Sequence, residues 1–298
     1  MSANNPIPNI KLNNGVELPI LGFGMAFVST VFSDDELPRV IGEALEEGYR
    51  FFDCAPAYGN QAKVAKILKN SGVPREELFI TTKIPAAGHG YENTLNAYET
   101  VTEEMGLDYL DLYMIHHPLL DYESFCASWK ALEKLNKEGR VRSIGMASFL
   151  EVHLEHIFRM CEIPPQVDLL ECNPFLTIES CRAYCASKGV HVVSWFAQGG
   201  PLVPLKPYPL KEYPLLMENE CVVSIAKAHG RTPAQIPLRW ALQKGMTPLV
   251  RSSKREHMRE NREIFDFVLS DVEMSRLDAL NYDRRFGLDP MKHTANHP

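Results

Sequence analysis

The alternation of short apolar runs with amphipathic segments constrains the fold of this 298-residue chain more than any other feature. Eight runs have the length and side-chain types of buried strands: Pro19–Gly22, Tyr49–Asp53, Leu78–Lys83, Leu110–His116, Val141–Met146, Val167–Glu171, His191–Trp195 and Thr247–Arg251. Segments with helical spacing lie between them: Asp34–Glu47, Gln61–Asn70, Tyr91–Met105, Tyr122–Glu138, Glu151–Met160, Ile178–Lys188 and Thr232–Gln243. Such alternation predicts an α/β fold with a parallel sheet, and eight units fit a closed (β/α)8 TIM barrel better than an open sheet.

Three segments fall outside the alternation. Asn9–Leu12 and Val16–Leu18 flank the turn 13–15, Asn-Asn-Gly, which predicts an N-terminal hairpin that plugs the bottom of the barrel. The Pro-rich segment Gly199–Pro214 predicts a long loop on the C-terminal face, where barrel enzymes hold their active sites. Residues 283–298 are polar and are expected to form an irregular C-terminal tail.

Composition and charge argue against several classes of protein. The net charge of −7 lacks the basic footprint of a nucleic-acid binder. The longest apolar runs are too short to span a membrane, and the N-terminus lacks the apolar region of a signal peptide. Seven cysteines without a Cys-x-x-Cys pair are typical of free thiols in a reducing compartment. We therefore expect one cytoplasmic domain over residues 1–298, as a monomer or weak dimer without a membrane or nucleic-acid partner.

Common cofactor and metal motifs are not found in the sequence. Gly22–Phe27 begins like the dinucleotide-binding pattern Gly-x-Gly-x-x-Gly but lacks the third glycine. There is no phosphate-binding loop, no His-Glu-x-x-His and no Gly-x-Ser-x-Gly motif. His116 and His117 adjoin on a predicted strand, so their side chains should point to opposite faces. We therefore expect no metal site.

Four polar residues lie at or just after the C-terminal ends of three successive predicted strands. They are Asp53, Tyr58, Lys83 and His116. Each alone has an ordinary structural explanation, such as a turn cap for the aspartate or a solvent-reaching lysine. Because the ends of barrel strands converge on one rim, we expect the four side chains to lie together there.

These residue types suit one kind of chemistry. A tyrosine phenol has a pKa of about 10, and a neighbouring ammonium lowers it. Such a tyrosine can donate a proton to a carbonyl oxygen while a cofactor delivers hydride to the carbon. Lys83 would be the ammonium, Asp53 would hold it, and His116 would orient the substrate oxygen.

The motifs around these residues resemble the signature of the aldo-keto reductase family. They are Phe52–Ala55 with Tyr58–Asn60, Thr81–Lys83 and Asp111–His116, and the resemblance runs in family order from Gly15 to about Leu280. It implies an NADPH-dependent enzyme on a (β/α)8 barrel that reduces an aldehyde or ketone to the alcohol. It also implies a catalytic tetrad of Asp53, Tyr58, Lys83 and His116, with Tyr58 as the proton donor and with His116 and His117 in the substrate pocket.

The resemblance further implies which residues contact the cofactor. They are Gly24, Asp53, Ser148, Trp195, Arg251, Ser252, Glu260 and Asn261. Trp195 would stack under the nicotinamide, and Arg251 would bind the 2′-phosphate. Ala147 and Leu169 stand where the family has hydrogen-bonding partners of the carboxamide, and His257 stands where it has an arginine.

Two other functions stay open on the residues alone. A cofactor-binding barrel that regulates a partner protein with little catalysis would tolerate the altered carboxamide site, whereas the four rim residues argue against it. A hydrolase on the same barrel would need a metal or a pair of carboxylates at the rim, and the sequence offers neither.

Overall fold

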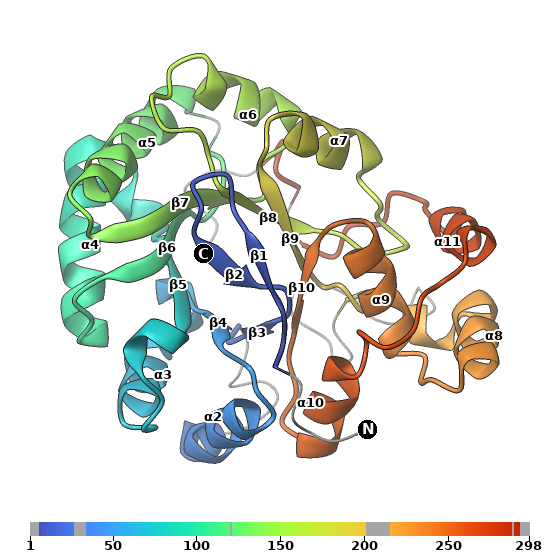
Figure 1. Cartoon of the computed structure of the whole chain (residues 1–298). Helices are drawn as coiled ribbons and strands as arrows, with labels where there is room; N and C mark the ends of the chain where they lie inside the picture. Colours follow the sequence, from blue (N-terminus) through green and yellow to red (C-terminus); the bar gives the residue numbers. More distant parts are fainter. Residues whose placement is uncertain (1–5, 27–33, 120, 201–214, 288, 293–298) are drawn as a thin grey trace.

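The computed structural model describes residues 6–26, 34–119, 121–200, 215–287 and 289–292. Parallel strands close into a barrel in the order β10-β3-β4-β5-β6-β7-β8-β9, and helices surround it (Figure 1). The strands are β3 (Gly22–Gly24), β4 (Phe51–Asp53), β5 (Phe79–Ile84), β6 (Leu110–Ile115), β7 (Val141–Ala147), β8 (Val167–Glu171), β9 (His191–Trp195) and β10 (Thr247–Val250). The predicted (β/α)8 barrel is confirmed.

The N-terminal hairpin is also confirmed and closes one end of the barrel. Its strands are β1 (Asn9–Lys11) and β2 (Glu17–Pro19), which pair antiparallel. Leu12 and Leu18 are buried in one cluster with interior side chains of the barrel. The side-chain amide Nδ2 of Asn14 donates to the carbonyl of Arg142 at 3.0 Å, which fixes the hairpin to the start of β7.

The first barrel strand lies further along the chain than the sequence predicts. The predicted strand Pro19–Gly22 is wrong because Pro19 belongs to the hairpin and pairs with Asn9. The observed strand begins at Gly22, where a Cβ would lie 2.4 Å from the Leu249 side chain and 2.6 Å from Phe51. A glycine is therefore needed at this close approach between neighbouring strands.

All seven predicted helical segments contain a helix. These helices are α2 (Leu37–Glu46), α3 (Gln61–Lys69), α4 (Tyr91–Met105), α5 (Tyr122–Lys137), α6 (Glu151–Phe158), α7 (Glu179–Ser187) and α9 (Gln235–Gln243). Three more follow β9 and β10: α8 (Glu220–His229), α10 (Arg255–Arg262) and α11 (Asp271–Asp278). Helix α11 begins with reciprocal hydrogen bonds between Ser270 and Glu273.

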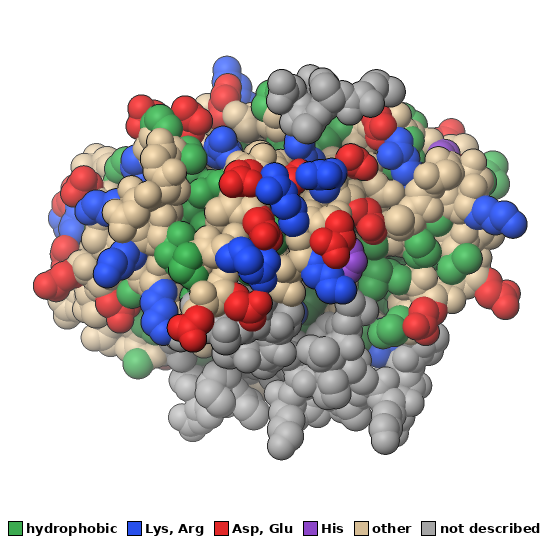
Figure 2. All heavy atoms as spheres, turned by 90° about the horizontal axis from the view of Figure 1, so that it is seen from below, with side chains coloured by type: hydrophobic (Ala, Val, Ile, Leu, Met, Phe, Trp, Pro, Cys, Tyr) green, Lys and Arg blue, Asp and Glu red, His purple; other side chains and the backbone are tan. Residues whose placement is uncertain are grey.

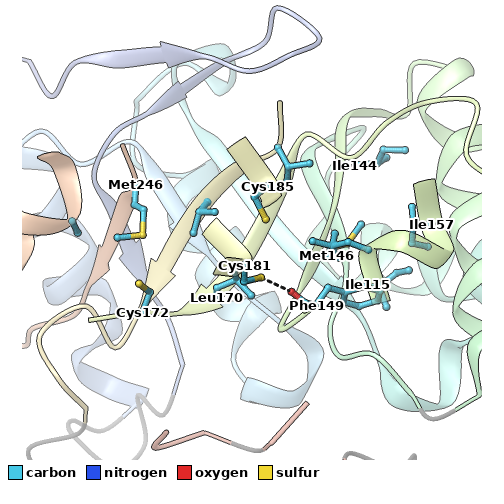
Figure 3. Close-up of a cluster of buried hydrophobic side chains, with 14 of the residues drawn as sticks. Ile115, Ile144, Met146, Phe149, Ile157, Leu170, Cys172, Cys181, Cys185 and Met246 are labelled. Carbon is cyan, nitrogen blue, oxygen red and sulfur yellow. Dashed lines mark hydrogen bonds between the residues drawn. The ribbon is translucent and has the colours of Figure 1, made fainter. Parts of the chain in front are cut away.

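The largest apolar cluster lies between the barrel wall and the surrounding helices. Cys172, Cys181 and Cys185 pack there beside Met146 and Leu170, as Figure 3 shows. All seven cysteines are free. Within the part of the chain that the structure describes, no helix has the length and apolarity that crossing a bilayer requires. The predicted Pro-rich loop lies outside the described residues from position 201 to 214, as does the tail from 293 to 298.

Candidate active site

The four predicted catalytic residues lie on neighbouring elements at the C-terminal rim. Asp53 is the last residue of β4, and Tyr58 ends the 3-10 turn Pro56–Tyr58 that follows it. Lys83 lies near the end of β5, and His116 comes directly after β6. Because β4, β5 and β6 pair side by side, the barrel brings the four residues to one edge.

Lys83 is the centre of a buried hydrogen-bond cluster. Its ammonium donates to the Asp53 carboxylate at 2.7 Å, to the backbone oxygen of Cys54 at 2.9 Å and to the Tyr58 hydroxyl at 3.1 Å. The Lys83 side chain is fully buried. The Thr81 hydroxyl donates to the same Asp53 oxygen at 2.8 Å. The three ammonium protons therefore face three acceptors, which fixes the cation against the phenol.

Burial and charge act in opposite directions on this cluster. Burial opposes the charge on Lys83, but Asp53 and Tyr58 outweigh it and raise the lysine pKa above its ordinary value. Burial raises the pKa of Tyr58 to about 12, although the Lys83 cation acts to lower it. Lys83 therefore acts on the tyrosine pKa in the expected direction, but burial is the larger effect and the net pKa lies above its usual value. The phenol keeps its proton at neutral pH and can donate it.

The two adjacent histidines lie on the same side of the rim. The His116 ring is edge-on to the Tyr58 ring, with 6.1 Å between their centroids. The His116 and His117 rings stack at 4.3 Å with 13° between their planes. The expectation of opposite faces is wrong because β6 ends at Ile115, so the alternation of a strand does not extend to either histidine. Across the described residues, no group of three or more His, Cys, Asp or Glu side chains is placed to hold a metal ion.

Two further residues at the rim have strained backbones. Ser148 follows β7 with φ of 62°, and Phe196 follows Trp195 with φ of 51°. Non-glycine residues in this region cost about 1–3 kcal/mol each and are concentrated at functional sites. Ala147 and Leu169 are register partners beside Ser148, and both side chains are buried. Their hydrocarbon groups offer no hydrogen bond to a ligand.

Several of the predicted cofactor contacts are held by hydrogen bonds within the protein. The Arg251 guanidinium donates to the backbone oxygen of Ala26 at 2.5 Å, which joins the end of β10 to the loop after β3. Asn261 accepts from Gln198 at 2.9 Å, and Glu260 accepts from the Thr232 hydroxyl at 2.5 Å. Gly24 ends β3 beside Asp53, its register partner, and Ser252 is buried next to Arg251.

Helix α10 is docked on α2 through a buried carboxylate that sequence reasoning missed. Glu47 is 2% exposed, and it accepts hydrogen bonds from Arg255 at 2.7 Å and from Arg259 at 2.9 Å. The Arg259 hydrogen bond is the main cause that lowers the pKa of Glu47. Arg255 and Arg259 thus hold α10 in place, and His257 is exposed on this helix. On the face of the protein that Figure 2 shows from below, acidic and basic side chains are interspersed.

Comparison with known proteins gives one consistent family. The sequence model described as "Aldo/keto reductase family" matches residues 20–282. Glyoxal reductase of Bacillus subtilis (strain 168) is 41% identical over 281 residues, which are 94% of this chain and 95% of that protein. Morphine 6-dehydrogenase of Pseudomonas putida is 37% identical over 285 residues, 95% of this chain and 94% of that protein.

A solved structure of similar shape extends the comparison. The crystal structure of the Bombyx mori aldo-keto reductase in complex with NADP superposes with a TM-score of 0.90 at 27% identity. The match covers 98% of this chain and 99% of that chain. On fold and sequence together, the chain belongs to the aldo/keto reductase family.

Proposed function

We propose that this protein is an NADPH-dependent oxidoreductase that reduces the carbonyl of a small aldehyde or ketone to the alcohol. The observation that carries the proposal is the buried Lys83 ammonium, bonded to Asp53 and to the Tyr58 hydroxyl beside His116. The similarity to a glyoxal reductase and to an aldo-keto reductase in complex with NADP supports the same chemistry. The enzyme would act in the cytoplasm as a monomer or weak dimer.

Tyr58 serves as the proton donor in this proposal. NADPH, when bound, supplies the hydride. The phenol is protonated before the reaction and gives its proton to the carbonyl oxygen as negative charge develops there. Lys83 stabilises the phenolate that is left behind, and Asp53 holds the ammonium in position.

His116 serves to orient the carbonyl oxygen. Its ring is close enough to Tyr58 for both to reach one substrate oxygen, the phenol as acid and a ring nitrogen as hydrogen-bond donor. Stacking on His117 restricts the tilt of the His116 ring, and both histidines line the substrate pocket.

The rim residues fit NADPH in most of its parts. Arg251 and Ser252 offer a cation and a hydroxyl for the 2′-phosphate, and Trp195 offers an aromatic face for the nicotinamide. Glu260 and Asn261 would contact the adenine of NADPH. Gly24, Asp53 and Ser148 would contact its nicotinamide end. Because Ala147 and Leu169 are apolar, carboxamide contacts are lost that contribute about 1 kcal/mol each.

NADPH binding is expected to quench part of the intrinsic fluorescence, because the nicotinamide would stack on Trp195. The other two tryptophans, Trp129 and Trp240, are fully buried in helices α5 and α9. A titration of wild type and Trp195→Tyr with NADPH checks this. If the variant binds NADPH and keeps the whole wild-type quench, the stacking role of Trp195 is wrong.

The proposed function is tested by NADPH absorbance against a panel of aldehydes, ketones and quinones that includes glyoxal. At least one carbonyl should be reduced, with one NADPH consumed for each alcohol formed. Saturable NADPH binding with no turnover on any member would favour the regulatory barrel instead. This second function is favoured by the buried apolar side chains of Ala147 and Leu169, which offer no hydrogen bond to the nicotinamide carboxamide.

A further inference from the structure

Near the end of the described chain, residues 282–287 form an irregular segment that packs on the rim beside Trp195. The backbone amides of Tyr282 and Arg284 donate to the Phe175 carbonyl at 3.4 and 3.1 Å. Phe286 is 6% exposed, and its ring lies 6.1 Å from the Phe196 ring. Residues 284–287 are therefore packed on the rim, whereas the side chains of Tyr282 and Asp283 are exposed.

One carboxylate holds this segment. Glu171, the last residue of β8, is 1% exposed. Its Oε1 accepts the backbone N–H of Phe286 at 2.5 Å, and its Oε2 accepts the backbone N–H of Gly287 at 2.8 Å. The Arg285 guanidinium lies 4.0 Å from the same carboxylate. A buried carboxylate is costly unless it is paired or hydrogen-bonded, and here the segment supplies these partners. We call the Glu171 carboxylate with these two amides the tail clip.

The tail clip is in direct contact with the indole. Glu171 and Trp195 are register partners on β8 and β9. A Cβ on Gly287 would lie 2.2 Å from Cη2 of Trp195 and 2.9 Å from Oε2 of Glu171. The Gly287 backbone therefore lies against the outer edge of the indole, and only glycine fits there. A displacement of the clip would therefore displace the Gly287 backbone that packs against the Trp195 ring.

We propose that Glu171 is a positioning residue that clips the segment Arg284–Gly287 against Trp195 and so sets the place of the indole that offers its face to the nicotinamide of NADPH. The role of the indole rests on the proposed function, whereas the clip itself does not. Glu171 touches neither cofactor nor substrate in this account and acts only through the segment and Trp195.

The charge of Glu171 depends on the clip. Burial raises the pKa of Glu171 to about 7, while the amides of Phe286 and Gly287 and the Arg285 cation act to lower it. Measurements at pH 8.5 therefore examine the ionised carboxylate, which accepts both N–H groups.

The first test is Glu171→Gln, which keeps the shape but replaces one acceptor oxygen by an NH2 group that opposes a backbone N–H. Loss of a hydrogen bond to a charged group should raise the equilibrium constant for local opening of the segment about 10–100-fold. Hydrogen exchange at the amides of Phe286 and Gly287 should accelerate by this factor. The emission of Trp195, taken as the difference from Trp195→Phe, should shift. Glu179→Gln, an exposed glutamate on α7 that pairs with Arg182, is the matched control and should change neither readout.

Cofactor binding separates positioning from general stability. In Glu171→Gln, the dissociation constant of NADPH should rise and the quench of Trp195 emission by NADPH should change, because the nicotinamide would stack on a displaced indole. The ratio of the dissociation constants for NADPH and NADH should stay as in wild type, because both cofactors carry the nicotinamide and the clip does not touch Arg251. Gly287→Ala leaves Glu171 intact but forces the segment from the indole, so it should give the same changes in amide exchange, Trp195 emission and NADPH affinity. This second variant also decides the matter if Glu171→Gln does not fold.

Three results would overturn the proposal. Unchanged amide exchange in Glu171→Gln removes the clip. Faster exchange with unchanged Trp195 emission removes the link to the indole. Faster exchange with wild-type NADPH affinity and wild-type quench by NADPH assigns Glu171 a structural role only. If wild type reduces no carbonyl, the proposed function fails, and exchange and emission still decide the clip.

Discussion

Replacing Tyr58 with phenylalanine is expected to lower kcat for carbonyl reduction by about 10²–10⁴, the usual contribution of a general acid. The substitution removes one hydroxyl, which Lys83 contacts at 3.1 Å. The dissociation constant of NADPH should be nearly unchanged, because the phenol is offered to the substrate oxygen rather than to the cofactor. Steady-state kinetics with a good aldehyde substrate and a fluorescence titration with NADPH measure the two quantities.

A matched tyrosine serves as the control for this prediction. Tyr91 is 37% exposed at the start of α4, so Tyr91→Phe should keep wild-type turnover. If Tyr58→Phe retains more than half of the wild-type rate while the chemical step limits turnover, Tyr58 is not the proton donor.

Replacing Arg251 with methionine is expected to weaken NADPH binding roughly 10–100-fold and to affect NADH little. A charge-assisted hydrogen bond to the 2′-phosphate contributes about 1.5–3 kcal/mol, and NADH lacks that phosphate. The substitution also removes the hydrogen bond from Arg251 to the Ala26 carbonyl. Because both cofactors share that loss, the ratio of the two dissociation constants is the quantity to measure.

Arg159→Met provides the control, since the Arg159 side chain is 72% exposed and pairs with Glu155 on α6. The ratio of the dissociation constants for NADPH and NADH in Arg159→Met should equal that of wild type. An equal loss of both cofactors in Arg251→Met would mean that Arg251 supports the loop after β3 and does not bind the 2′-phosphate.

Periodicity was sufficient to predict the barrel, because each strand and helix has its own apolar spacing in the sequence. It was less reliable at strand ends. Residues Pro19–Gly22 have the apolar character of a strand, but pairing with β1 takes Pro19 into the hairpin. His116 and His117 were placed on a strand that ends one residue earlier, so their stacked rings were not foreseen. Helix α8 was missed, although Val222, Ile225 and Ala226 have helical spacing and form its buried face.

Within the candidate site, the residue types were predictable and their environment was not. The sequence places a lysine near Tyr58 but carries no measure of burial, so it suggested a lowered tyrosine pKa where burial raises it. Glu171 and Glu47 had no motif to mark them. The partners of Glu171 are backbone amides 115 and 116 residues away, and backbone amides have no sequence signature.

The path of the hydrogen atoms distinguishes hydride transfer from NADPH from reduction by hydrogen taken from solvent. The protein is incubated with an aldehyde and NADPH that carries deuterium in both positions at C4, and the alcohol is analysed by mass spectrometry and NMR. We expect deuterium on the carbinol carbon, and none there when ordinary NADPH is used in D2O. In Tyr58→Phe the same labelling should occur at a rate lower by about 10²–10⁴. An alcohol whose carbinol carbon takes its hydrogen from solvent, or NADPH oxidation without alcohol, would contradict hydride transfer from NADPH to the carbonyl.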